Sequence, residues 1–258
     1  MQWQNLLQHL GDWEGSFTRL TPRGEPVDDT PTLVSLTGLD DNRRIRQTIA
    51  RFPEGDAPAP QVIEYGSLNR NTLVFEDGTF SVGSSQFGPF SEFGAEIGFV
   101  ESDRRLRLVS LFNRDSHLSS ITLIRERRQD TTAPDRPQTT VEQLVGTWQG
   151  TITTLYPDLR PRATAESLVT VRQVGDRLES VLKSGRWELT TSARIDGTRL
   201  LFDRDEPTAQ VLLLPDGASC TTPLEIRNRQ VFFWRLGGCS HPPGGGARFA
   251  ATTIAGRG

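Results

Sequence analysis

The chain has 258 residues, a hydrophobic content of 35%, 24 glycines, 16 prolines and a formal net charge of −3. This length suits one large domain or two of ordinary size, and the turn-rich composition argues against a helical bundle or a disordered tail. The small negative charge gives no general attraction to nucleic acid or to an anionic membrane surface, so neither is expected as a partner.

Gln4–Leu10 is the first predicted element, a helix of one or two turns that precedes Trp13. The residues up to Leu10 are polar and amphipathic and lack an apolar stretch of secretory length, and no membrane span is visible along the chain. We therefore expect a cytoplasmic or plastid-stromal protein without membrane insertion.

The motif Gly11-Asp-Trp-Glu-Gly15 opens the first predicted strand. In a small barrel, a tryptophan at this place can plug one end, and the flanking glycines let the backbone bend and approach its neighbours closely. A cation stacked on the indole completes such a plug. We expect Arg125, which shares a face of the last strand with Ile121 and Leu123, to lie against Trp13.

Short strands separated by turns follow in the first half of the chain. The sequence Glu76-Asp77-Gly78 predicts a hairpin, because glycine tolerates the positive φ of a tight turn. The predicted strands are Pro31–Leu39, Arg43–Phe52, Gln61–Leu68, Thr72–Phe75, Leu106–Phe112 and Leu118–Arg125.

Four charged residues of the first half are candidates for a functional site, namely Glu96, Arg105, Arg107 and Glu126. In one interpretation they form an ionic cluster inside the first barrel, and such clusters often line a ligand pocket. In the other interpretation these residues, which alternate with apolar ones, face water.

Three phenylalanines of the first half, Phe87, Phe90 and Phe93, are candidates for the mouth of a cavity that holds a hydrophobic molecule. The alternative is that they pack in the core and in turns. Only the first interpretation implies a ligand site, and it places that site in the first half of the chain.

A polar segment that holds Pro134 and Pro137 separates two related halves. When the chain is aligned with itself at an offset of 135 residues, Leu10–Pro22 matches Val145–Pro157 with six of 13 positions identical, and Trp13 falls on Trp148. A repeat of this length indicates a duplicated domain. The predicted domains are 1–128 and 141–258, with the linker at 129–140.

The second half repeats the plan of the first. Val141–Val145 predicts a short helix with Thr140 as its N-cap, and Pro215-Asp216-Gly217 predicts a hairpin. The predicted strands are Ser167–Val174, Asp176–Leu182, Trp187–Ile195, Thr198–Phe202 and Gln230–Leu236. The expected fold is all-β, with two tandem antiparallel β-barrels and short N-terminal helices. Trp148 is the second candidate barrel plug, although the sequence offers no equally clear cation for it.

Metal and catalytic sites are not indicated. The three histidines, His9, His117 and His241, have no partner at a ligand spacing, and Cys220 and Cys239 with His241 match no common zinc template. No nucleophile and base occur in a recognisable pattern. We therefore expect neither a cofactor nor a metal, and no enzymatic activity.

The Gly-x-Trp motif with an arginine on the last strand resembles the lipocalin and calycin pattern. The segments Phe93–Phe99, Arg104–Val109 and Leu118–Glu126 resemble more specifically a two-barrel calycin family of cyanobacteria and chloroplasts, largely of unknown function. That family includes a plant biogenesis factor required for the chloroplast ATP synthase. The second half departs from the family, because it ends with Gly244-Gly-Gly-Ala-Arg-Phe249 in place of an arginine-rich strand.

The resemblance implies a non-enzymatic assembly scaffold whose partners are protein subunits, those of the ATP synthase catalytic head. The alternative is a carrier or lyase-like binder of a small apolar ligand, a lipid or a tetrapyrrole such as a bilin, in a barrel cavity. An interior filled by large side chains favours the scaffold, and an open cavity favours the carrier.

Overall fold

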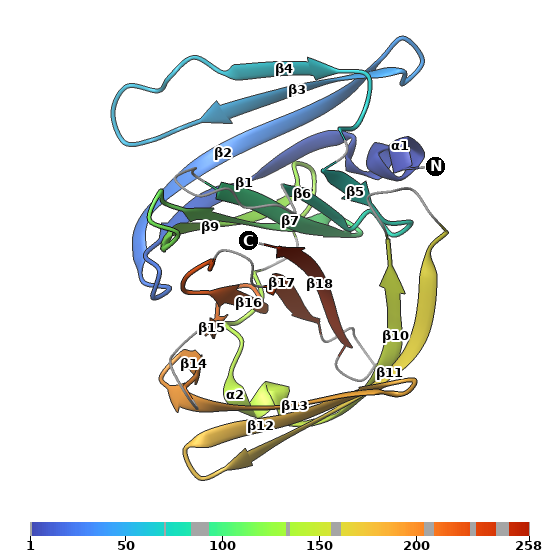
Figure 1. Ribbon diagram of the computed structural model, residues 1–258. Helices are drawn as coiled ribbons and strands as arrows, with labels where there is room; N and C mark the ends of the chain where they lie inside the picture. Colours follow the sequence, from blue (N-terminus) through green and yellow to red (C-terminus); the bar gives the residue numbers. More distant parts are fainter. Residues whose placement is uncertain are drawn as a thin grey trace. The chain divides into compact units, whose positions relative to one another are not determined.

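The sequence repeat corresponds to two compact units in the computed structural model, Met1–Asp135 and Arg136–Gly258. The structure describes residues 2–69, 71–83, 93–132, 135–155, 161–203, 209–227, 231–240 and 248–257. Each unit contains a nine-stranded antiparallel sheet that curls into a half-barrel (Figure 1). This confirms the expected all-β fold, and the division between the units falls within the segment 129–140.

The first unit begins with a short helix and continues as an antiparallel meander. Its elements are α1 (Gln2–Leu6), the 3-10 turn η1 (Leu7–His9), β1 (Gly11–Leu20), β2 (Pro26–Leu39), β3 (Arg44–Arg51), β4 (Gln61–Tyr65), β5 (Thr72–Val74), β6 (Phe80–Gly83), β7 (Phe93–Glu101), β8 (Arg104–Phe112) and β9 (Leu118–Arg128). Strand β7 was not predicted from the sequence, because Gly94 and Gly98 interrupt its apolar pattern.

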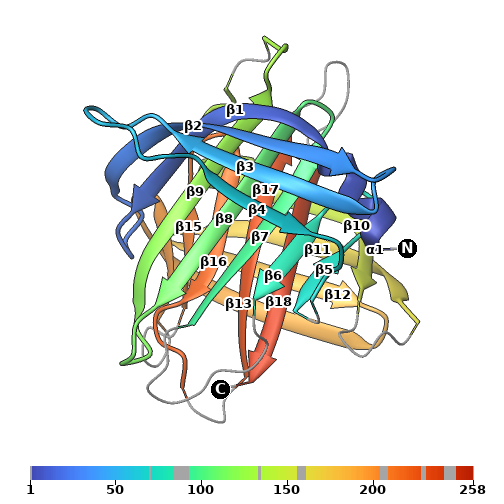
Figure 2. The ribbon, with the colours of Figure 1, turned by 90° about the horizontal axis from the view of Figure 1, so that it is seen from above.

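The strand order in this sheet is β4-β3-β2-β1-β9-β8-β7-β6-β5, so the first strand pairs with the last at the centre. In Figure 2, β1 to β4 run across β5 to β9 at a steep angle. A buried hydrophobic core lies on the inner face of β1, β2 and β3. It consists of Trp13, Val34, Leu36, Ile45 and Ile49. The described residues form no ladder between β4 and β5, so these two strands are the edges of the sheet.

The helix α1 bridges these two edges. The amide nitrogen of Val74 in β5 donates to the Gln2 side chain (3.0 Å), and the Val74 carbonyl accepts from Asn5 Nδ2 (3.1 Å). At the opposite edge of the sheet, the ring of Trp3 packs edge-on against the ring of Tyr65 in β4, with 6.2 Å between the ring centroids. Side chains of the helix therefore satisfy edge groups that a neighbouring strand would otherwise satisfy.

The second unit has a similar order of elements. They are α2 (Val141–Leu144), β10 (Gly146–Thr154), β11 (Ala163–Val174), β12 (Arg177–Ser184), β13 (Trp187–Asp196), β14 (Arg199–Phe202), β15 (Ala209–Leu213), β16 (Ala218–Pro223), β17 (Val231–Ser240) and β18 (Arg248–Arg257). Its strands pair in sequence order from β10 to β18. Thr140 caps α2 as expected, in a reciprocal capping box with Gln143.

Both predicted hairpins are present. Phe75 N donates to Thr79 O across the first turn, where Gly78 has a φ of 80°. In the second turn, Asp216 and Gly217 have φ values of 59° and 69°, which is the left-handed conformation that such sequences tolerate. Strands β15, β16 and β18 were missed, because their residues do not alternate between apolar and polar.

The two equivalent glycines Gly15 and Gly150 have different surroundings. Gly15 lies in β1 between β2 and β9, and a methyl group on it would overlap the backbone carbonyl of Arg125. Gly150 lies in β10, which is an edge strand, and an added Cβ would have Ser167 Oγ at 3.8 Å as its nearest neighbour. The first position therefore requires glycine and the second does not.

The substitution Gly15→Ala should lower the free energy of unfolding by about 2 kcal/mol, because the backbone of β9 has to move to admit the methyl group. The matched variant Gly150→Ala should change it by less than about 0.5 kcal/mol. Urea denaturation of both variants measures this difference. Equal effects at the two positions would contradict the close packing of β1 on β9.

Candidate functional site

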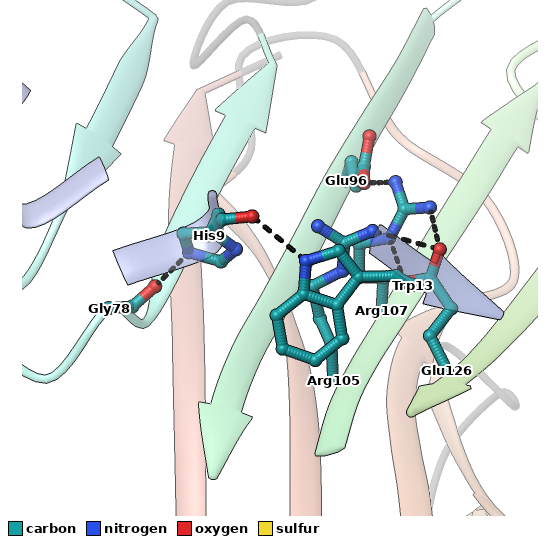
Figure 3. Close-up of polar contacts among 7 residues, drawn as sticks. All are labelled: His9, Trp13, Gly78, Glu96, Arg105, Arg107 and Glu126. Carbon is teal, nitrogen blue, oxygen red and sulfur yellow. Dashed lines mark hydrogen bonds and ion pairs between the residues drawn. The ribbon is translucent and has the colours of Figure 1, made fainter. Parts of the chain in front are cut away.

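An ionic cluster lies inside the first barrel, on the inner face of β7, β8 and β9 (Figure 3). Arg105 in β8 is directly opposite Glu126 in β9, so their side chains point to the same face, and Arg107 follows two residues later on that face. The Glu126 side chain is 0% exposed, and those of Arg105 and Arg107 are 3% and 9% exposed. The interpretation of these residues as an interior cluster is therefore correct.

Glu126 accepts hydrogen bonds from both guanidinium groups. Arg105 donates through Nε (2.6 Å) and Nη2 (2.9 Å), and Arg107 donates through Nε (3.0 Å) and Nη2 (2.9 Å). Arg107 Nη1 also donates to Glu96 (2.8 Å), whose side chain is 27% exposed. The paired forks leave the carboxylate of Glu126 fully satisfied, which a buried charge requires.

Trp13 stacks on Arg105 of this cluster, and its cationic partners differ from the prediction. The guanidinium carbons of Arg105 and Arg128 lie 4.6 Å and 4.5 Å from the indole centroid. The indole Nε1 donates to His9 O (2.8 Å), which joins the strand to the turn that precedes it. Two cations and one backbone carbonyl thus hold the ring in place.

The prediction that Arg125 stacks on Trp13 was wrong. Trp13 is opposite Arg128 in the β1–β9 ladder, and Arg125 is opposite Ser16, on the other face of the sheet. Its Nη2 donates to Ser16 Oγ (3.3 Å) and Thr18 Oγ1 (3.0 Å). Adjacent residues of a strand point to opposite faces of the sheet. A register that is wrong by one or three residues therefore assigns an outward-facing side chain to the inner face.

Burial and neighbouring charges shift the pKa values of Glu126 and His9. Burial alone would raise the pKa of Glu126, but the charges and hydrogen bonds of Arg107 and Arg105 outweigh that effect and hold the pKa at about 2. Burial and the charge of Arg105 lower the pKa of His9 to about 4. Neutral His9 donates through Nε2 to Gly78 O (2.7 Å), so this ring ties η1 to the β5–β6 turn. Neither His9 nor Arg128 was predicted, since nothing in their local sequence marks them as interior.

Phe93 packs against a residue of the neighbouring strand, and Trp148 packs within its own unit. Phe93 is buried, and its ring lies 5.9 Å from that of Phe112, so it contributes to packing. Trp148 Nε1 donates to Leu144 O (3.0 Å), which repeats the bond from Trp13 to His9 at an offset of 135 residues. The other two candidate pocket residues, Phe87 and Phe90, lie outside the described residues.

Among the described residues, no group of three or more His, Cys, Asp or Glu side chains has a geometry that could hold a metal ion. Cys220 is a buried free thiol, and burial raises its pKa. In the same part of the chain, no helix is long and apolar enough to cross a membrane.

The N-terminal domain of DUF3598, a domain of unknown function, matches residues 1–131. The chain belongs to the DUF3598 family. The C-terminal domain of biogenesis factor required for ATP synthase 1 matches residues 135–242. A crystal structure of a DUF3598 protein of unknown function from Nostoc punctiforme PCC 73102 is 42% identical, with a TM-score of 0.85, and the match covers 92% of this chain and 88% of that one.

These matches confirm the resemblance to the two-barrel family that includes the ATP synthase biogenesis factor. The two family models meet at the linker, one on each unit. A search of curated proteins finds no match.

The substitution Glu126→Gln should lower the free energy of unfolding by about 3 kcal/mol or more, because it leaves two buried guanidinium groups without their shared carboxylate. Glu14→Gln is the matched control, since Glu14 pairs with Arg127 at a half-exposed position of the same sheet (3.0 Å). The control should cost less than about 1 kcal/mol. Urea denaturation of both variants decides whether the interior pairing has the larger effect.

The neutral state of His9 makes stability depend on pH. The unfolded chain binds a proton at His9 below about pH 6.5, whereas the folded pKa is about 4, so folding stability is complete above pH 6.5 and falls as the pH drops to 4. The loss is about 3 kcal/mol. The variant His9→Gln, which keeps a donor for Gly78, should flatten this part of the profile. A profile unaffected by His9→Gln would contradict the buried neutral imidazole.

Proposed function

We propose that this protein is a non-enzymatic assembly factor that binds subunits of an ATP synthase while that enzyme is being built. The observation that carries the proposal is the match of residues 135–242 to the C-terminal domain of biogenesis factor required for ATP synthase 1. The finer proposal is that the subunits belong to the catalytic head and that the protein acts where this head is assembled, in the cytoplasm or the plastid stroma.

The interior of the first barrel supports a binding role over catalysis. The carboxylate of Glu126, whose pKa is strongly lowered, accepts two hydrogen bonds from Arg105 and two from Arg107. A catalytic acid or base needs access to a substrate and a pKa near the working pH, and Glu126 is fully buried with a pKa of about 2. This pattern is typical of a structural ion-pair network.

The same geometry argues against an apolar ligand at this level of the barrel. A lipid or tetrapyrrole would have to displace Arg105 from beneath the Trp13 ring and separate charges that are paired at 2.6–3.0 Å. Breaking a buried ion pair costs several kcal/mol, about 3–5 kcal/mol. The carrier hypothesis therefore has no observation in its favour at this place.

Removal of the gene from the native host tests the assembly role. We expect fewer assembled ATP synthase complexes on native gels and an accumulation of unassembled head subunits. A tagged copy that restores assembly should also co-purify those subunits from the same cells. Normal amounts of the complex in the deletion strain, together with no co-purifying subunit, would refute the proposal.

A further inference from the structure

A pocket of about 620 Å³ lies on the outer face of the first unit. Trp13 points inward, so its neighbours in β1, Glu14 and Ser16, point outward. Cross-strand neighbours of these two residues complete the floor, which consists of Glu14, Ser16, Pro31, Leu33, Arg125 and Arg127. The pocket therefore lies on the opposite side of the sheet from the ionic cluster of the barrel interior.

Three further residues form the walls of this pocket. Phe52 follows β3 and is 52% exposed, Arg104 begins β8, and Asp135 belongs to the segment between the two sequence repeats. The pocket thus combines guanidinium groups with the apolar surfaces of Phe52 and Leu33. Its volume is within the range of sites for small molecules, roughly 300–1,000 Å³.

Asp135 lies between two of the arginines without binding either of them closely. Its carboxylate oxygens are 3.9 Å from Arg104 Nη2 and 3.9 Å from Arg125 Nη1, and its side chain is 71% exposed. Charge-assisted hydrogen bonds in proteins are about 1 Å shorter. The Asp135 carboxylate thus lies between two cations but is too far from both for a close hydrogen bond. An anion that approached both arginines more closely would bind there more tightly.

Arg125 has bonding capacity that the described residues do not use. Its Nε is buried, and none of the described residues accepts a hydrogen bond from it. Its Nη2 donates to the neutral hydroxyl groups of Ser16 and Thr18, and it lies 3.6 Å from the carboxylate of Asp29, closer than to that of Asp135. A buried guanidinium donor without an acceptor is costly, which an incoming anion would relieve.

A carboxylate ligand in this pocket requires no change in its net charge. Arg127 pairs with Glu14 at 3.0 Å, so this pair contributes no net charge. Asp135 already places one carboxylate between Arg104 and Arg125, so a ligand carboxylate that takes this position replaces one negative charge with another.

We propose that this pocket binds a small organic carboxylate whose apolar part rests on Phe52 and Leu33, and that Asp135 occupies the carboxylate position when no ligand is bound. The linker aspartate then acts as a competing internal ligand. The proposal concerns a site on the outer face of the first unit and does not depend on the assembly role.

Calorimetric titration of the full chain with 3-phenylpropionate tests this site. The variant Asp135→Ala should bind this probe about three- to tenfold more tightly than the unchanged protein, because the internal competitor is gone. Asp130→Ala removes a nearby exposed linker carboxylate that does not line the pocket, and it should leave the affinity unchanged. Arg125→Gln should weaken binding at least tenfold.

Two further probes identify the recognised chemistry. The neutral amide 3-phenylpropanamide should not bind, and inorganic phosphate should bind more weakly than the carboxylate, since it has no apolar part. Equal binding of the amide, stronger binding of phosphate, or no gain in Asp135→Ala over Asp130→Ala would each overturn the proposal. The comparison of the two aspartate variants remains decisive even if Arg125→Gln unfolds, because both aspartates are exposed.

Discussion

Glu126 accepts hydrogen bonds from Arg105 and Arg107 in the interior of the first barrel, and much of the surrounding structure depends on that pairing. Placing two cations in a barrel is unfavourable unless a carboxylate neutralises them and satisfies their donors. The pairing requires β8 and β9 to be in one register, since a slip by one residue would turn Glu126 outward. Arg105 then provides the surface on which Trp13 rests.

The N-terminal residues extend this arrangement to the edges of the sheet. Trp13 donates to the carbonyl of His9, and the His9 ring donates to Gly78 in the turn after β5. Gln2 and Asn5 bond the backbone of Val74 in the same edge strand. The interior ion pairs, the indole and the N-terminal turn therefore form one connected set of contacts.

Much of this fold could be predicted from the sequence, and less of the site. The repeated Gly-x-Trp-x-Gly motif predicts two β domains, because its residue types are specific for strand packing. The ionic cluster could be proposed from the alternation of charges but not decided, since the same alternation is typical of exposed strands. The cations that stack on Trp13 could not be predicted. Which residues of β9 face inward depends on the pairing register of β1 and β9, and the local sequence does not determine that register. His9 and Asp135 act through contacts far along the chain, which a local pattern cannot reveal.

The pairing of β1 with β9 also affects how the first unit is made. During synthesis, Gly11–Leu20 is complete long before its partner strand Leu118–Arg128 exists, so one side of β1 stays unpaired while about 100 residues are added, which takes roughly 5–20 s at usual translation rates. Contacts so distant in sequence form slowly, because loop closure must precede them. The nascent chain thus exposes a strand edge beside Trp13 for that interval, and a folding helper that covers this edge would act before the linker leaves the ribosome.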